Sequence, residues 1–128
     1  YSLWRLQNNT IHTFLSVYSK MIYGEDIESM NTFEKIYELV AKILRGKVTT
    51  YKALADLTGT NPKVVGYALH ANKDPDNVPC HRVINSKGRV SEGNAFGGPK
   101  IQQKMLENEG VIFDKWGKTN LQKYAFYS

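Results

Sequence analysis

The sequence predicts a mainly helical α+β domain, and three observations lead to this prediction. Apolar residues recur at helical spacing in five segments, most of which begin at a capping residue or a proline and end at a glycine. Two of the central helices are separated by only a few residues. Short extended segments in the second half add a small β-structure. A chain of 128 residues and 14.6 kDa has the length of one domain and can bury a core without disulfides.

A short strand-helix segment (1–30) is predicted ahead of the main domain (31–128). Residues 2–6 favour a strand, and the apolar residues over 11–22 follow one stripe of a helix. Residues 25–29 are acidic and lack periodicity, as is typical of a linker. We therefore place the domain boundary near residue 30.

Two capping signals mark the first helices of the main domain. Asn31 is followed three residues later by Glu34, a pattern that indicates a helix start. The apolar face of this helix leads to a predicted end at Gly46. Thr50 can cap the next helix, which Gly59 is expected to end.

A third helix follows after a turn of only a few residues. Asn61 and Pro62 mark its start, because proline is well placed at the first helical position. Val64, Val65 and Leu69 then supply its apolar face. Two helices joined this closely have the geometry of a helix-turn-helix, which suits DNA binding. Any small helical bundle also has short turns with glycine, so both interpretations stay open.

The segment around the only cysteine is predicted to be loop and strand. Residues 72–78 are polar and predict a loop, and residues 79–84 predict an extended, half-buried segment. The sequence of residues 85–88 is typical of a turn. Arg89 and Val90 are expected to return as a second strand.

The last third combines a loop, a helix and a strand. Residues 91–98 contain three glycines and predict a flexible loop. Pro99 opens a helix that Gly110 is expected to end, and residues 111–113 favour a strand. The aromatic tail to Ser128 gives no clear signal for either structure.

The chain is basic, and the excess lies in the main domain. Lys and Arg outnumber Asp and Glu by five, which gives a pI near 9.3. Residues 1–30 hold two basic and three acidic side chains, so residues 31–128 carry +6. This balance suits a polyanionic partner such as nucleic acid, and ordinary solubility explains it equally well.

The composition argues against a membrane, disulfide or metal protein. No apolar run approaches the roughly 18 residues that a membrane span needs, and no secretion signal is recognisable. One cysteine excludes an intrachain disulfide, and three histidines, His12, His70 and His81, lie too far apart for a usual zinc pattern. We expect no metal, no cofactor and a cytoplasmic location (nuclear in a eukaryote). The start at Tyr1 rather than methionine suggests a processed or truncated form.

Cys80 is the strongest candidate for a reactive side chain, although most lone cysteines are small buried hydrophobes. A thiol becomes a strong nucleophile only as thiolate, which needs a base or a positive field. His81 follows at once, but neighbours on an extended chain point to opposite faces, so a bridging water is one way to couple them. A carboxylate on the other ring nitrogen would orient the imidazole, and Glu107 and Glu109 are candidates.

The pentapeptide Pro79-Cys80-His81-Arg82-Val83 is similar to the active-site motif of a known family. This family is the 6-O-alkylguanine-DNA alkyltransferases, or methylated-DNA–protein-cysteine methyltransferases. Further family features occur in the same order over a region from about Phe33 to Ile112. They are Gly46-Lys47-Val48-Thr49-Thr50-Tyr51 with Leu54-Ala55, Asn61-Pro62-Lys63 with Val65-Gly66, the hinge Asn72, and Gly97-Gly98 with Leu106, Glu109 and Gly110.

The resemblance implies the fold and the activity of the family. The expected fold is a winged-helix-like helix-turn-helix, the alkyltransferase C-terminal domain. The expected activity is stoichiometric repair of double-stranded DNA that contains O6-alkylguanine. The family binds in the minor groove, flips the damaged base out of the stack and moves the alkyl group to its own cysteine. The implied protein is a monomer that needs no cofactor and no metal.

The resemblance also assigns roles to individual residues. It implies that Cys80 accepts the alkyl group, that His81 is a base acting through water and that Glu109 orients His81. Asn72 would support the loop that positions the site, and Tyr51 would press on the DNA backbone. The implied base pocket consists of Tyr51, Val83, Phe96 and Gly97, flanked by Ser86. The implied DNA contacts are Tyr51, Lys52, Asn61, Lys63, Gly66 and Ser86.

The sequence departs from the family pattern at three places. Lys63 stands nearest the position at which the family inserts an arginine into the vacated stack, and lysine lacks the flat guanidinium. The loop before Gly97 holds Asn94-Ala95-Phe96, where relatives often carry a tyrosine beside small residues. The segment 1–30 is much smaller than the usual first domain of the family, so it is either a remnant or a truncated end.

Two other functions are compatible with the same motifs. The alkyltransferase-like proteins bind the same lesions and lack the cysteine, so a non-catalytic lesion-binding module is one alternative. A DNA-binding regulator, in which Cys80 is a sensor or simply buried, is the other.

Overall fold

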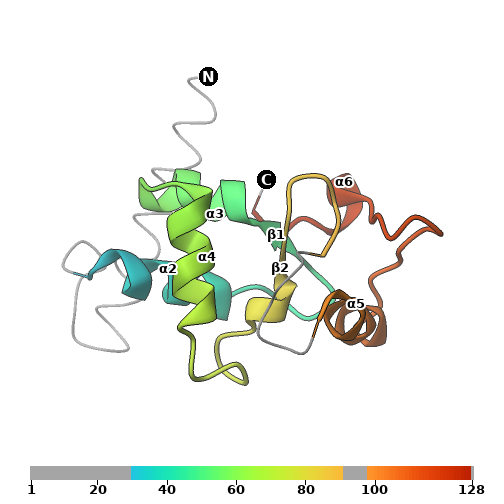
Figure 1. Cartoon of the computed structure of the whole chain (residues 1–128), viewed down its shortest axis with the longest axis horizontal. Helices are drawn as coiled ribbons and strands as arrows, with labels where there is room; N and C mark the ends of the chain where they lie inside the picture. Colours follow the sequence, from blue (N-terminus) through green and yellow to red (C-terminus); the bar gives the residue numbers. More distant parts are fainter. Residues whose placement is uncertain (1–29, 91–97, 128) are drawn as a thin grey trace.

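The computed structural model describes residues 30–90 and 98–127 (Figure 1). Predicted elements in the segment 1–30 and the predicted loop residues 91–97 lie outside the described residues, apart from residue 30 itself. The elements, in chain order, are α2 (Thr32–Ala41), β1 (Thr49–Thr50), α3 (Tyr51–Thr58), α4 (Pro62–His70), the 3-10 helix η2 (Cys80–Arg82), β2 (Val83–Ile84), α5 (Pro99–Asn108) and α6 (Leu121–Tyr124). The mainly helical α+β fold is confirmed.

The helices begin and end at the residues that carry capping signals. Asn31 accepts a hydrogen bond from the backbone N–H of Glu34 at 2.9 Å and donates to its carboxylate at 2.8 Å. The side chains of Thr50 and Asn61 each accept a backbone N–H three residues further on, at 3.0 Å. Gly59 ends α3 in the left-handed region at φ 71°, which a residue with a Cβ adopts only at a cost.

Helices α2, α3 and α4 pack around one apolar cluster. Ile36, Leu54 and Val65, one from each helix, are fully buried in it. Tyr37 on α2 donates its hydroxyl to the Ala68 carbonyl on α4 at 2.7 Å, which fixes α4 against α2. The short connection between α3 and α4 makes the predicted helix-turn-helix.

A second cluster lies under the sheet and the later helices. It contains Val48, Ile84, Leu106, Val111 and Tyr124. The C-terminal segment is attached to this cluster, because the Val48 N–H donates to the Tyr124 carbonyl at 2.9 Å. Helix α6, which the sequence pattern left unassigned, therefore rests on a core residue far away in the chain. No helix of the described residues has the length and apolar character needed to cross a membrane.

The prediction of an extended segment over residues 79–84 is wrong for its first part. Residues Cys80–Arg82 form a 3-10 turn, and only Val83–Ile84 is a strand. This strand does not pair with Arg89 and Val90 but with β1, in parallel register. The physical reason is local, since the Asn85 side chain accepts the backbone N–H groups of residues 87 and 89 and holds them in a turn.

Two other sequence expectations need correction. The first helix of the main domain ends at Ala41 and not at Gly46. The predicted strand 111–113 is reduced to a single bridge between Phe113 and Thr119, which closes a tight turn.

Candidate active site

Cys80 lies at the start of η2, against the cluster of the three helices, and is 7 % exposed. Burial raises the pKa of its thiol, while a hydrogen bond with the Asn72 side chain and a backbone hydrogen bond lower it. The net direction is upward. The resting group is therefore a protonated thiol, which needs a base before it can act as a nucleophile.

Asn72 ties the loop before the cysteine together. It directly follows the C-terminal end of α4, and its Nδ2 donates to the Val78 carbonyl at 2.9 Å. Its Oδ1 accepts the Asp74 N–H at 3.0 Å. The end of α4 and the approach to Cys80 are thus held by one side chain, and its role as a hinge stays a prediction.

His81 and Glu109 form a buried pair. His81 Nε2 lies 2.8 Å from Glu109 Oε2, and both side chains are almost inaccessible. Glu109 is the residue that terminates α5. Because Glu109 engages Nε2, any action of the imidazole on the thiol of Cys80 runs through Nδ1. Glu107, the other candidate carboxylate, is exposed on α5.

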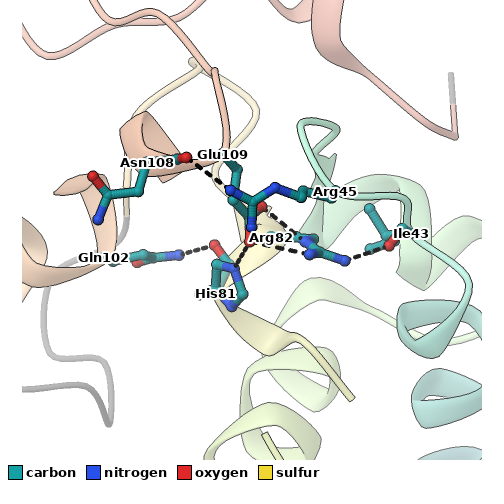
Figure 2. Close-up of polar contacts among 7 residues, drawn as sticks. All are labelled: Ile43, Arg45, His81, Arg82, Gln102, Asn108 and Glu109. Atoms are coloured by element: carbon teal, nitrogen blue, oxygen red, sulfur yellow. Dashed lines mark hydrogen bonds and ion pairs between the residues drawn. The ribbon is translucent and has the colours of Figure 1, made fainter. Parts of the chain in front are cut away.

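Arg82 completes this cluster, and sequence reasoning gave it no role (Figure 2). Its Nε donates to Glu109 Oε1 at 2.9 Å and its Nη2 to Oε2 at 3.0 Å, a bidentate pair. Its Nη1 donates to the Ile43 carbonyl at 2.6 Å, just beyond α2. The only feature of the sequence that could have pointed to Arg82 was its position in the pentapeptide, beside His81.

The Glu109 carboxylate is held in its charged form. Burial raises its pKa, but hydrogen bonds from Arg82 and His81 and the charges of both groups outweigh burial and lower the pKa to about 2. A carboxylate that stays charged and fixed in place can stabilise a positive charge on the His81 ring.

Removing the Glu109 charge is expected to change how stability depends on pH. Its pKa is about 2 in the folded protein and near 4.5 in the unfolded chain, so its stabilisation is complete above pH 4.5 and is lost as the pH falls toward 2. Urea unfolding midpoints measured from pH 6 to pH 3 should fall less steeply for Glu109→Gln than for the wild type. Glu107→Gln is the control, and an equally flattened curve for both variants would contradict the assignment.

Gln102 supports the same segment from α5. It is 1 % exposed, and its Nε2 donates to the carbonyls of His81 and Val83 at 2.9 and 3.0 Å. These carbonyls lie on η2 and β2, so Gln102 fixes the backbone that carries the cysteine. Nothing in the sequence pattern distinguished this glutamine from an exposed polar residue of the helix.

The predicted base-pocket residues are only partly placed. Val83 is fully buried in the helix cluster, and Tyr51 is half-buried at the first position of α3, packed against the same cluster. Phe96 and Gly97 lie outside the described residues. Val83 and Tyr51 thus belong to the same apolar cluster as Cys80, and the base pocket itself stays a prediction.

Most predicted DNA contacts lie on the outer surface of the helix-turn-helix. Lys52 and Lys63 are exposed, and a Cβ built on Gly66 meets no described atom within 4 Å, so packing inside the protein does not require this glycine. Asn61 instead caps α4 with its side-chain oxygen. Ser86 is exposed in the turn after β2.

The described residues contain no group of three or more His, Cys, Asp or Glu side chains that could hold a metal ion.

Comparison with known families gives a match over the helix-turn-helix and the cysteine site. Residues 31–111 match the sequence model of the 6-O-methylguanine DNA methyltransferase, DNA binding domain. The chain belongs to this family. The match ends two residues after Glu109, so it includes both partners of the buried histidine–carboxylate pair.

Two of the curated relatives that match this chain are archaeal methyltransferases. A methylated-DNA–protein-cysteine methyltransferase of Sulfurisphaera tokodaii is 39 % identical over 92 residues, 71 % of this chain and 57 % of the relative. One of Saccharolobus solfataricus is 45 % identical over 76 residues, 59 % of this chain and 48 % of the relative. The chain thus spans about half the length of these relatives.

Solved structures of the family have the same fold. S. pombe Atl1 in complex with damaged DNA containing O6-carboxymethylguanine has a TM-score of 0.65 at 35 % identity, and the match covers 76 % of this chain and 95 % of Atl1. The O6-methylguanine-DNA methyltransferase of Pyrococcus kodakaraensis has a TM-score of 0.56 at 31 % identity, over 74 % of this chain and 61 % of that protein.

Proposed function

We propose that this protein repairs O6-alkylguanine in duplex DNA by moving the alkyl group to Cys80. The observation that carries the proposal is the buried cluster in which His81 and Arg82, the two residues after the cysteine, share the Glu109 carboxylate. The cluster holds a base at the residue that follows Cys80 in the chain, and the thiol of Cys80 is otherwise protonated. The archaeal relatives named as methyltransferases support the same activity.

The reaction needs only groups that the chain contains. His81 Nδ1 takes the thiol proton through a water molecule, and Glu109 stabilises the imidazolium that forms. The sulfur of Cys80 then bonds to the alkyl carbon while the carbon–oxygen bond breaks. The electron pair stays on the guanine oxygen, and the proton held by His81 completes the guanine that leaves. A thioether remains on the protein, and no oxidant or reductant takes part.

Access to the target requires that the base leaves the duplex, because the reacting carbon is out of reach inside the stack. The helix-turn-helix of α3 and α4 is the element proposed to bind the duplex, with Gly66 allowing close approach of the backbone of α4. The similarity to Atl1 bound to damaged DNA supports this use of the fold.

A second candidate function is lesion binding without transfer. It is favoured by one observation, that the structural match covers 95 % of Atl1, a protein crystallised on a damaged duplex. In this alternative the helix-turn-helix and the pocket bind O6-alkylguanine, and the buried Cys80 remains a thiol.

Intact mass measurement decides between these functions. After incubation with a duplex containing O6-methylguanine, the wild-type chain should gain one methyl group in place of the thiol hydrogen, on the peptide that contains Cys80. A chain that binds this duplex tightly and keeps its mass would be the lesion-binding module. A chain that keeps its mass and binds damaged and undamaged duplex equally well would be a regulator.

A further inference from the structure

The helix-turn-helix carries little of the positive charge of this protein. Residues 50–72, which contain α3 and α4, hold Lys52 and Lys63 against Asp56, a net charge of +1. The Nζ atom of Lys52 lies 3.5 Å from the Asp56 carboxylate, so these two charges largely cancel. Duplex binding draws much of its free energy from cations placed at phosphates. Helices α3 and α4 therefore provide only a small part of the attraction that a duplex needs.

Five exposed basic side chains lie elsewhere, on the loop after β2, the turn 114–118 and α6. Asp114 is the only acidic residue in the segments 85–90 and 110–128, so these segments carry +4 of the +6 of residues 31–128. We call the five side chains the basic stripe. They are Lys87, Arg89, Lys115, Lys118 and Lys123.

Backbone contacts bring the segments of the basic stripe together. The Thr119 N–H donates to the Gly88 carbonyl at 2.9 Å, which places the turn 114–118 beside the loop after β2. A Cβ on Gly88 would lie 3.5 Å from Cγ of Lys118, so the stem of this lysine passes along the loop. Lys123 lies on α6, which begins two residues after Thr119. Figure 1 shows this loop between α3 and α6.

The single carboxylate of these segments is occupied by the turn itself. Oδ1 of Asp114 accepts the backbone N–H groups of Trp116 and Lys118 at 2.9 and 3.0 Å. Lys115 Nζ lies 4.6 Å from the centre of the Trp116 ring, which is 66 % exposed. All five cations of the stripe are exposed, as is the Trp116 ring beside Lys115, and exposed cations with an aromatic ring suit contact with a nucleic-acid backbone.

The basic stripe is connected to the cysteine site by the sheet. Cys80 lies in η2, β2 follows directly, and the loop with Lys87 and Arg89 comes next. β2 pairs in parallel with β1, whose last residue, Thr50, caps α3. The loop and the start of the helix-turn-helix therefore leave the same end of the sheet.

We propose that the basic stripe binds the phosphate backbone of the duplex that flanks the damaged base. This inference rests on the proposed function and adds a second contact to the helix-turn-helix. The stripe supplies the sequence-independent attraction, while α4, which carries little charge, approaches the groove. Duplex affinity is then set mainly by residues outside the two helices.

The salt dependence of binding tests the stripe directly. The triple variant Lys115→Gln, Lys118→Gln, Lys123→Gln removes three charges and keeps much of each side-chain stem. With an undamaged duplex, the slope of log affinity against log salt should fall by about two to three, because each lost phosphate contact contributes roughly 0.9. Lys63→Ala, on α4, should lower the slope by about one.

The matched control removes the same charge at another place. The variant Lys35→Gln, Lys100→Gln, Lys104→Gln changes positions on α2 and α5. Its slope of log affinity against log salt should differ from the wild-type slope by less than about one. A stripe variant with the wild-type slope would overturn the proposal. So would a control variant whose slope falls as much as that of the stripe variant, since net charge alone would then explain the effect.

A second measurement separates this proposal from the repair reaction. Transfer from free O6-methylguanine base, followed by mass, should be the same in the stripe variant and the wild type, because no duplex takes part. If the wild type gains no methyl group from the methylated duplex either, the repair proposal fails and the salt slopes still decide on the stripe. If only the stripe variant loses transfer from the free base, the stripe supports the site itself, and the flanking-duplex proposal is wrong.

Discussion

Replacing Cys80 with alanine is expected to abolish alkyl transfer completely while the protein still binds a duplex containing O6-methylguanine. The chain contains one cysteine, so no second thiol can accept or later release the group. The cysteine is a small side chain at the edge of the helix cluster, and its loss leaves Arg82, His81 and Glu109 in place. The transfer should therefore be lost without loss of the fold.

Intact mass after incubation with the methylated duplex, together with an electrophoretic shift on the same duplex, measures both effects of Cys80→Ala. Glu107→Gln, a change at an exposed carboxylate on α5, is the control and should transfer normally. A methyl group found on Cys80→Ala at any residue would show that the acceptor lies elsewhere. A wild-type chain that gains more than one methyl group would contradict the single-acceptor reaction.

Replacing Glu109 with glutamine is expected to slow alkyl transfer by about 10²-fold or more, the range of a lost general-base function. The glutamine side chain has the same shape but no charge, so the Arg82 guanidinium beside it is left without its bidentate partner. The positive charge that forms on His81 then lies next to an uncompensated cation instead of a carboxylate. Duplex affinity should change little, because none of these groups belongs to the helix-turn-helix or to the basic stripe.

Single-turnover transfer rates of Glu109→Gln, compared with duplex affinity measured on the same protein, test this assignment. Glu107→Gln removes an exposed carboxylate from the last turn of α5 and should retain the wild-type rate. If Glu109→Gln transfers at the wild-type rate, Glu109 has no part in the reaction. If it loses rate and affinity in equal measure, its role is to support the fold and not to orient His81.

The amino-acid sequence determined the features that depend on neighbours in the chain. The ends of the helices followed from Asn31, Thr50, Gly59 and Asn61, because a capping side chain or a left-handed glycine acts on groups within a few residues. The helix-turn-helix followed from the same signals. The pentapeptide around Cys80 led to the family and to the expected roles of His81 and Glu109.

Only the tertiary structure decided how these pieces meet. The pairing of β1 with β2 and the 3-10 turn at Cys80–Arg82 replaced an expected hairpin, because strand partners are chosen by contacts far apart in the chain. The contact of Arg82 with Glu109 and that of Gln102 with the His81 carbonyl join residues about twenty or more positions apart. No local pattern encodes such distances.

The basic charge of the chain shows the same division. The sequence determined that residues 31–128 carry +6, an excess that suits DNA binding and ordinary solubility equally well, without saying which surface holds it. The structure separates a nearly neutral helix-turn-helix from a basic stripe that the Gly88–Thr119 contact assembles. Composition records how much charge a chain carries, whereas the folded backbone decides which charges act together, since electrostatic attraction depends on distance in space.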